Sequence, residues 1–182
     1  MKGFGKVDFV IADVDDTKSI GQFLSVELQT IDITGSVSKA YSAILNGEHL
    51  AKRPSTGFNW DNVYKRYVTQ LVRKGYFHHH WNSKIVAVIP EQVYEYIIKR
   101  ASFITTTDVR SKDSNIIFVT YALESLPPGQ GFSYRPKLVR CEGTSHSALQ
   151  SAMMYAEAPG RPAFINRIQH SLANEVILPS FD

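Results

Sequence analysis

Residues 23–33 have the sequence FLSVELQTIDI, a largely apolar run that contains the polar pair Glu27 and Gln29. The run is typical of a β-strand, in which side chains two positions apart project from the same face. Val26 and Leu28 therefore project from the opposite face. A carboxylate within a hydrophobic strand costs free energy unless it is paired, hydrogen-bonded or bound to a cation. Metal coordination explains Glu27, and so does a chance placement of polar residues on a half-exposed strand.

A second carboxylate lies in the preceding apolar run, KVDFVIAD, at residues 6–13. Asp8 stands between Val7 and Phe9 in a run that is predicted to be a buried strand. The sequence DDTKSIGQ, residues 15–22, has the composition of a turn, so we expect the two strands to form a hairpin or to lie near each other. Two carboxylates on neighbouring strands can bind one hard cation.

Magnesium held by carboxylates suits phosphodiester hydrolysis, because the ion neutralises the scissile phosphate and activates water. Asp8 and Glu27 are the predicted ligands. Gln29 can orient the attacking water but cannot serve as an ordinary general base. The sequence therefore predicts a catalytic set of Asp8, Glu27 and Gln29 with Mg²⁺ as the cofactor.

Helical and strand patterns alternate along the rest of the chain. Helices are predicted over residues 36–45, 59–77, 91–101, 146–158 and 161–175, and strands over residues 84–90, 115–123 and 134–143. This alternation predicts an α/β fold with a mixed central β-sheet flanked by helices. Because no internal repeat is visible, residues 1–182 are predicted to form a single domain.

The helix predicted over residues 59–77 is rich in basic side chains. These are Lys65, Arg66, Arg73 and Lys74. They are candidates for contacts to DNA phosphates, which would give salt-dependent affinity without sequence information, and a solvated helix face is an equal alternative. The run His78–His80 is predicted to be a solvated loop, because three consecutive histidines cannot all face one metal ion.

Composition narrows the class of protein only partly. The chain has 182 residues, of which 43% are hydrophobic, and its net charge of +3 is compatible with a nucleic-acid partner without requiring one. Cys141 is the only cysteine, so no internal disulfide can form, and we expect it to be a small buried residue. Neither a membrane-spanning run nor a signal peptide is evident, which predicts a cytoplasmic protein.

Several segments resemble one known family in the same order along the chain. They are VDFVIADV, FLSVELQTIDITGSVSKAYSAI, DNVYKRYVTQLVRK, VIPEQVYEYI and IIFVTYALE. In this order they resemble the NotI-type restriction endonucleases, which have the Asp…(Asp/Glu)-x-Lys nuclease pattern in a Glu-x-Gln variant. The resemblance covers most of the chain and is looser after residue 125.

The resemblance implies a restriction-endonuclease-like fold and magnesium-dependent cleavage of double-stranded DNA at a specific sequence by a type II homodimer. The catalytic residues of the family fall on Asp8, Glu27 and Gln29. The N-terminal iron-binding region of the family, and an acidic residue upstream of the catalytic Asp, have no counterpart in these residues. The expected explanations are a shortened member, a fragment of a longer gene, or half of a split enzyme whose separate partner supplies the N-terminal region.

Two other functions fit parts of the sequence. IADVDDTKS matches the DxDxT opening motif of haloacid-dehalogenase-like phosphatases, with Asp13 as nucleophile, Asp15 as acid/base and Thr17 completing the motif. A polar hairpin turn explains the same residues. The second alternative is a catalytically impaired DNA-binding or assembly module.

Overall fold

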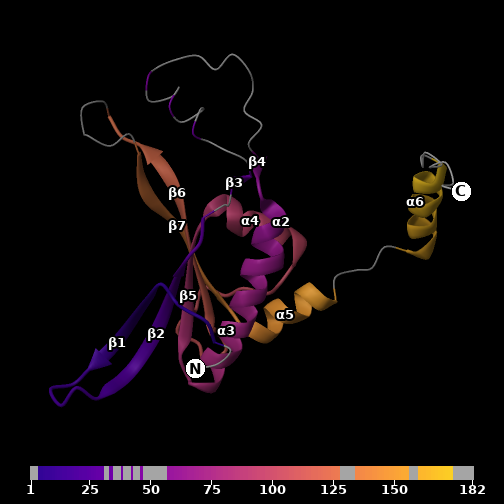
Figure 1. The fold of residues 1–182 in the computed structure, drawn as a ribbon. Helices are drawn as coiled ribbons and strands as arrows, with labels where there is room; N and C mark the ends of the chain where they lie inside the picture. Colours follow the sequence, from indigo (N-terminus) through magenta and orange to yellow (C-terminus); the bar gives the residue numbers. More distant parts are fainter. Residues whose placement is uncertain are drawn as a thin grey trace, which may run out of the picture.

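The computed structural model describes residues 4–30, 33–34, 57–127, 134–155 and 160–173, together with positions 38, 42 and 46. The strands are β1 (Phe9–Val14), β2 (Ile20–Leu28), β3 (Ile33–Thr34), β4 (Gly57–Phe58), β5 (Lys84–Pro90), β6 (Ile116–Ser125) and β7 (Tyr134–Thr144). The helices are α2 (Trp60–Asn62), the π-helical stretch η1 (Val63–Val68), α3 (Thr69–His80), α4 (Glu91–Arg100), α5 (His146–Met154) and α6 (Arg161–Ala173). Figure 1 shows their arrangement.

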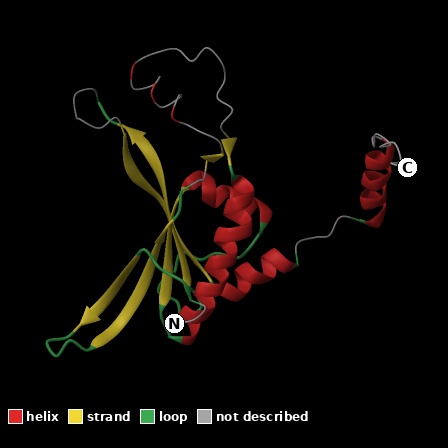
Figure 2. Cartoon of the chain, viewed as in Figure 1, coloured by secondary structure: helices red, strands yellow, loops and turns green. Residues whose placement is uncertain are grey.

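The main sheet has five strands in the order β1-β2-β5-β6-β7. The pairs β1–β2 and β6–β7 are antiparallel, whereas β5 is parallel to both of its neighbours. A parallel connection needs a crossover, which α2, η1 and α3 supply before β5 and α4 supplies after it. The two crossovers move in the same direction across the sheet. Right-handed crossovers of this kind place their helices on the same face of the sheet, as Figure 2 shows. The predicted α/β class, a mixed sheet flanked by helices, is confirmed.

The hydrophobic core lies between this sheet and the crossover helices. Along β5, the side chains of Ile85, Ala87 and Ile89 are fully buried, and those of the intervening Val86 and Val88 are half-buried. Such alternation is expected of a sheet whose two faces are covered unequally. The helices contribute the buried residues Val63, Tyr67, Val68, Leu71, Val93 and Ile97.

The edge strands are more exposed than the sequence predicted. In β1, Phe9 is 57% exposed and Ile11 is 61% exposed, although the sequence predicted a buried strand. On β7, Cys141 is also exposed rather than buried. Both predictions were wrong because an apolar run does not reveal whether its strand lies at the edge of the sheet, with a neighbour on one side only.

The turn between β1 and β2 is held by the side chain of Asp15. Its Oδ1 accepts hydrogen bonds from the backbone N–H groups of Thr17 and Ser19, each at 2.9 Å, and from the Thr17 hydroxyl at 2.7 Å. The bond from the Thr17 hydroxyl is the main cause that lowers the pKa of Asp15. The predicted hairpin turn is confirmed.

Most predicted elements lie where the sequence placed them. β5 covers the predicted residues 84–90, and α4 ends one residue before its predicted end at position 101. The helix predicted over residues 36–45 falls in a segment of which only positions 38 and 42 are described. Across the described ranges, no helix combines the length and the apolar character needed to cross a membrane.

The histidine run belongs to a helix and not to a loop. His78–His80 form the last turn of α3, and His78 is fully buried. Its ring lies 5.7 Å from that of Phe4 and 5.4 Å from that of Trp81, measured between centroids. Within the described part of the chain, His78 Nε2 has no hydrogen-bond partner. The loop prediction was wrong because the helical pattern continues through the histidines.

Acidification is expected to destabilise the fold through His78. Burial, followed by the charge of Lys74, lowers the pKa of His78 to about 4. The unfolded chain, with a pKa of about 6.5, then binds more protons between these values, so the free energy of unfolding falls as the pH drops through that window. We expect the free energy of unfolding to fall by about 2 kcal/mol. This figure is smaller than the full pKa shift would give, because solvent partly screens the charge of His78.

Urea titrations at several pH values measure this effect. The variant His78→Phe should flatten the dependence between about pH 6.5 and 4, because an aromatic ring replaces the titrating one. His80→Phe, at an exposed position of the same helix, is the control and should leave the slope unchanged. An unaltered slope in His78→Phe would rule out His78 as the cause.

Candidate functional site

Glu27 lies near the end of β2, on the sheet face that the crossover helices cover. It pairs in register with Ala87, which is fully buried, so the two side chains share that face. The Glu27 side chain is 12% exposed, and its Oε1 accepts a hydrogen bond of 2.5 Å from Lys74 Nζ. Among the described residues, its other carboxylate oxygen has no donor. Within the described ranges, this oxygen of Glu27 is therefore available to a ligand.

The partner of Glu27 is a buried lysine on α3. The Lys74 side chain is 7% exposed, and its Nζ also donates a hydrogen bond of 2.6 Å to the carbonyl of Lys6. This placement differs from the predicted basic face, which grouped Lys74 with Arg73. The signal that could have revealed it is the helical spacing from Tyr67 and Leu71, which places Lys74 on the apolar side of the helix.

Asp8 lies at the start of the β1–β2 hairpin, beside Glu27. Its Oδ2 accepts a hydrogen bond of 2.7 Å from the backbone N–H of Leu28. Extending the register one step beyond the Phe9–Val26 pair sets Asp8 opposite Glu27. The structure thus brings the two predicted carboxylates to the same end of the hairpin.

Tyr67 of η1 is a member of this site that the sequence did not reveal. It is 5% exposed, and its hydroxyl is buried without a hydrogen-bond partner among the residues that the structure describes. Burial raises the pKa of Tyr67, and the charges of Glu27 and then Asp8 raise it further, so the hydroxyl lies within electrostatic reach of both carboxylates. Buried hydroxyls nearly always have a partner, and a bound ligand or water would supply one here.

Gln29 directly follows Leu28, the last residue of β2. Its Nε2 donates a hydrogen bond of 2.6 Å to the carbonyl of Thr30, which leaves its Oε1 as an acceptor. Gln29, Tyr67 and Arg66 line a cavity of about 210 Å³. Lys65 lines neither this cavity nor the one beside Glu27. Gln29 therefore belongs to the candidate site, whereas Lys65 lies outside these cavities.

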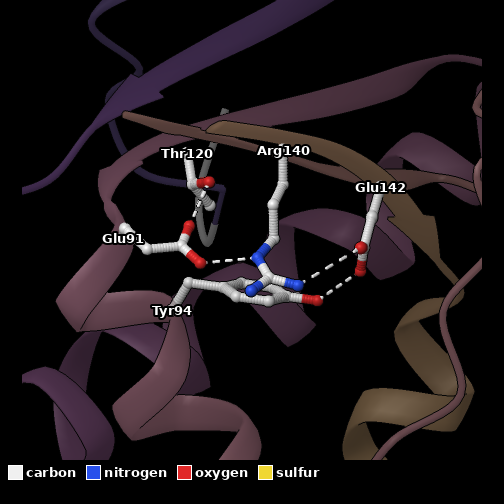
Figure 3. A network of polar contacts seen from close by, with 5 residues as sticks. All are labelled: Glu91, Tyr94, Thr120, Arg140 and Glu142. Atoms are coloured by element: carbon white, nitrogen blue, oxygen red, sulfur yellow. Dashed lines mark hydrogen bonds and ion pairs between the residues drawn. The ribbon is translucent and has the colours of Figure 1, made fainter. Parts of the chain in front are cut away.

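A second polar cluster, shown in Figure 3, contrasts with this site. Glu91 accepts hydrogen bonds from Thr120 Oγ1 and Arg140 Nε, both at 2.5 Å. Glu142 accepts one of 2.6 Å from the Tyr94 hydroxyl, and its other oxygen lies 3.9 Å from Arg140 Nη1. Each carboxylate oxygen thus has a donor or a cation nearby, and this network ties α4 to β6 and β7.

Asp8 and Glu27 are the two acidic side chains of the site, and the basic side chains of Lys6, Arg73 and Lys74 line the same cavity as Glu27. Within the described ranges, no cluster of at least three His, Cys, Asp or Glu residues has the arrangement of a metal site. A cation bound by Asp8 and Glu27 would therefore take its other ligands from water or substrate. Magnesium commonly binds in this way, through one or two carboxylates. The donor set fits Mg²⁺ better than zinc, which prefers nitrogen and sulfur ligands.

Comparisons with known proteins do not add to this description. The chain matches no protein-family model, and a search of curated proteins gives no significant match. The functional argument therefore rests on the residues of the site. Its distinguishing feature is the pair of carboxylates Asp8 and Glu27, of which Asp8 is exposed and Glu27 is largely buried against Lys74. Among the described residues, the buried hydroxyl of Tyr67 has no hydrogen-bond partner.

Proposed function

We propose that this protein is a magnesium-dependent endonuclease of the type II restriction kind, which hydrolyses phosphodiester bonds of double-stranded DNA at a specific sequence. The observation that carries the proposal is the pair of neighbouring carboxylates, the exposed Asp8 and the largely buried Glu27, together with a buried Tyr67 hydroxyl that has no partner among the described residues. A restriction-endonuclease-like core is compatible with the topology, in which one hairpin carries both carboxylates and a crossover helix leads to the adjacent parallel strand.

Asp8 and Glu27 are the residues that would hold the ion. When bound, Mg²⁺ supplies charge neutralisation at the scissile phosphate and lowers the pKa of a coordinated water. The hydrogen bond from Leu28 N–H fixes one oxygen of Asp8, and Lys74 fixes one oxygen of Glu27, so each carboxylate is oriented before a ligand arrives.

The other residues of the site position water and phosphate. Lys74 Nζ has three N–H donors and uses two of them, on Glu27 and the Lys6 carbonyl, which leaves one for a phosphate oxygen or water. The Oε1 of Gln29, which accepts no hydrogen bond from the described residues, can orient the attacking water. Lys74, from a helix, thus supplies the cationic group that the Glu-x-Gln sequence lacks.

A palindromic DNA target requires two such sites related by symmetry. The proposed enzyme therefore acts as a homodimer on double-stranded DNA. The phosphatase alternative gains no support from the hairpin, because Asp15 is bonded to its own turn and Asp13 lies on an exposed edge strand.

Cleavage of a long, sequence-diverse DNA tests the proposal. The full chain with Mg²⁺ should give discrete fragments, and both EDTA and the variant Asp8→Asn should abolish them. Asn at this position keeps an acceptor for the Leu28 N–H, so the local structure should persist. The matched control Asp13→Asn, on the same hairpin, should cleave normally.

The remaining outcomes would contradict the proposal. Cleavage that Asp8→Asn leaves unchanged would place the active site elsewhere. Hydrolysis of p-nitrophenyl phosphate that is lost in Asp13→Asn would favour the phosphatase alternative. Salt-dependent DNA binding without cleavage under any condition would favour a DNA-binding module.

A further inference from the structure

The helix beside the carboxylates carries two parallel rows of side chains. The inner row, Tyr67, Leu71 and Lys74, is buried. The outer row consists of Arg66, Gln70 and Arg73, all exposed, at the spacing i, i+4, i+7 that keeps side chains on one face of a helix. We name these three residues the outer row. It is the edge at which the buried site meets solvent.

Two cavities lie along the outer row and share Gln70. The first, of about 210 Å³, is lined by Arg66 and Gln70 together with Gln29 and Tyr67. The second, of about 400 Å³, is lined by Arg73 and Gln70 together with Glu27 and Lys74. Each cavity therefore joins one exposed arginine to residues of the candidate site.

We infer that the outer row is a phosphate clamp, in which Arg66 and Arg73 hold the backbone of one DNA strand at two points and the scissile phosphate lies between them. The inference rests on the proposed nuclease function and adds the place where the strand is bound. A guanidinium suits both points, because its planar fork donates two hydrogen bonds to a phosphate. Gln70, between the two arginines, is neutral and lines both cavities.

The spacing of the arginines lets them hold the strand at two separate points. Seven helical residues rise about 10 Å along the helix axis. Arg66 and Arg73 therefore reach different phosphates of the strand. Lys65, which lies outside both cavities, and Lys74, which is buried against Glu27, are not part of the clamp.

The salt dependence of DNA binding measures the clamp directly. Binding of a fluorescent DNA duplex to the full chain is measured between about 50 and 200 mM NaCl, with Ca²⁺ in place of Mg²⁺ to prevent cleavage. Arg66→Ala and Arg73→Ala should each weaken binding and reduce the slope of log K against log [salt] by about 1, and the double variant by about 2. Lys99→Ala, at an exposed position of α4, should leave the slope unchanged.

Parallel cleavage assays separate failure of the clamp from failure of the nuclease function. If the wild type cleaves DNA with Mg²⁺ but both arginine variants keep the wild-type slope and KM, the clamp is overturned and the nuclease function stands. If the arginine variants show the expected smaller slope but neither the wild type nor any variant cleaves DNA, Arg66 and Arg73 bind the strand as inferred and the nuclease function is overturned. If both arginine variants and Lys99→Ala lose slope equally, the binding is diffuse, which also overturns the clamp.

Discussion

Replacing Glu27 with glutamine is expected to lower the rate of magnesium-dependent DNA cleavage by about a thousandfold, because about 4 kcal/mol of transition-state stabilisation depends on the ion that this carboxylate would hold. The glutamine side chain has the same length and keeps an oxygen for Lys74, so the fold should survive. Single-turnover cleavage at saturating enzyme measures the effect on the chemical step.

A second carboxylate provides the control for this experiment. Glu124 on β6 is also paired with a cation, since its Oε2 lies 2.9 Å from Arg135 Nη2, but its side chain is 38% exposed. Glu124→Gln should cleave at the wild-type rate. A wild-type rate of DNA cleavage in Glu27→Gln would mean that Glu27 is not part of the active site.

Replacing Lys74 with methionine is expected to lower the free energy of unfolding by about 3 kcal/mol, because it leaves the Glu27 carboxylate buried without its partner. Adding Glu27→Gln to this variant should restore part of the loss, because a neutral amide is less costly to bury than an unpaired charge. Urea titrations of the two single variants and the double variant form a double-mutant cycle.

Arg73→Met is the matched control for Lys74→Met. It changes the neighbouring residue of the same helix, which is exposed, and should alter stability by less than about 0.5 kcal/mol. Strictly additive losses in the Lys74–Glu27 cycle would mean that the two groups do not interact, in conflict with their distance of 2.5 Å.

Hydrophobic periodicity was sufficient to predict most of the fold. The strand KIVAVIP and the helix after it were located correctly, because Pro90 ends one pattern and starts the other. The strand order was not predictable, since sequence spacing does not say that β5 lies between β2 and β6. The exposure of β1 depends on that order as well, because an edge strand has a neighbour on one side only.

The candidate site was only partly predictable, because polar residues on the apolar side of a helix were not distinguished from polar residues on its surface. Glu27 was noticed because a charged group stood out in an apolar strand. The same argument applies to Lys74 and His78, which continue the apolar helical row of Tyr67 and Leu71. Their adjacency to Arg73 and to other histidines made them look like parts of a polar surface, although neighbouring helical residues point in different directions.

The pairing of Lys74 with Glu27 depends on tertiary structure. The two residues are 47 positions apart, and they meet only because α3 packs against β5, the strand beside β2. The Tyr67 hydroxyl near both carboxylates depends on the same packing. Spacing along the sequence contains no information about such contacts.

The central claim is that Asp8 and Glu27 hold a divalent cation, and the most direct measurement is a titration of the full chain with Mn²⁺ followed by electron paramagnetic resonance. We expect one bound ion in the wild type and binding more than about tenfold weaker in both Asp8→Asn and Glu27→Gln, with Asp13→Asn unchanged. Equal Mn²⁺ affinity in all four proteins would contradict the account.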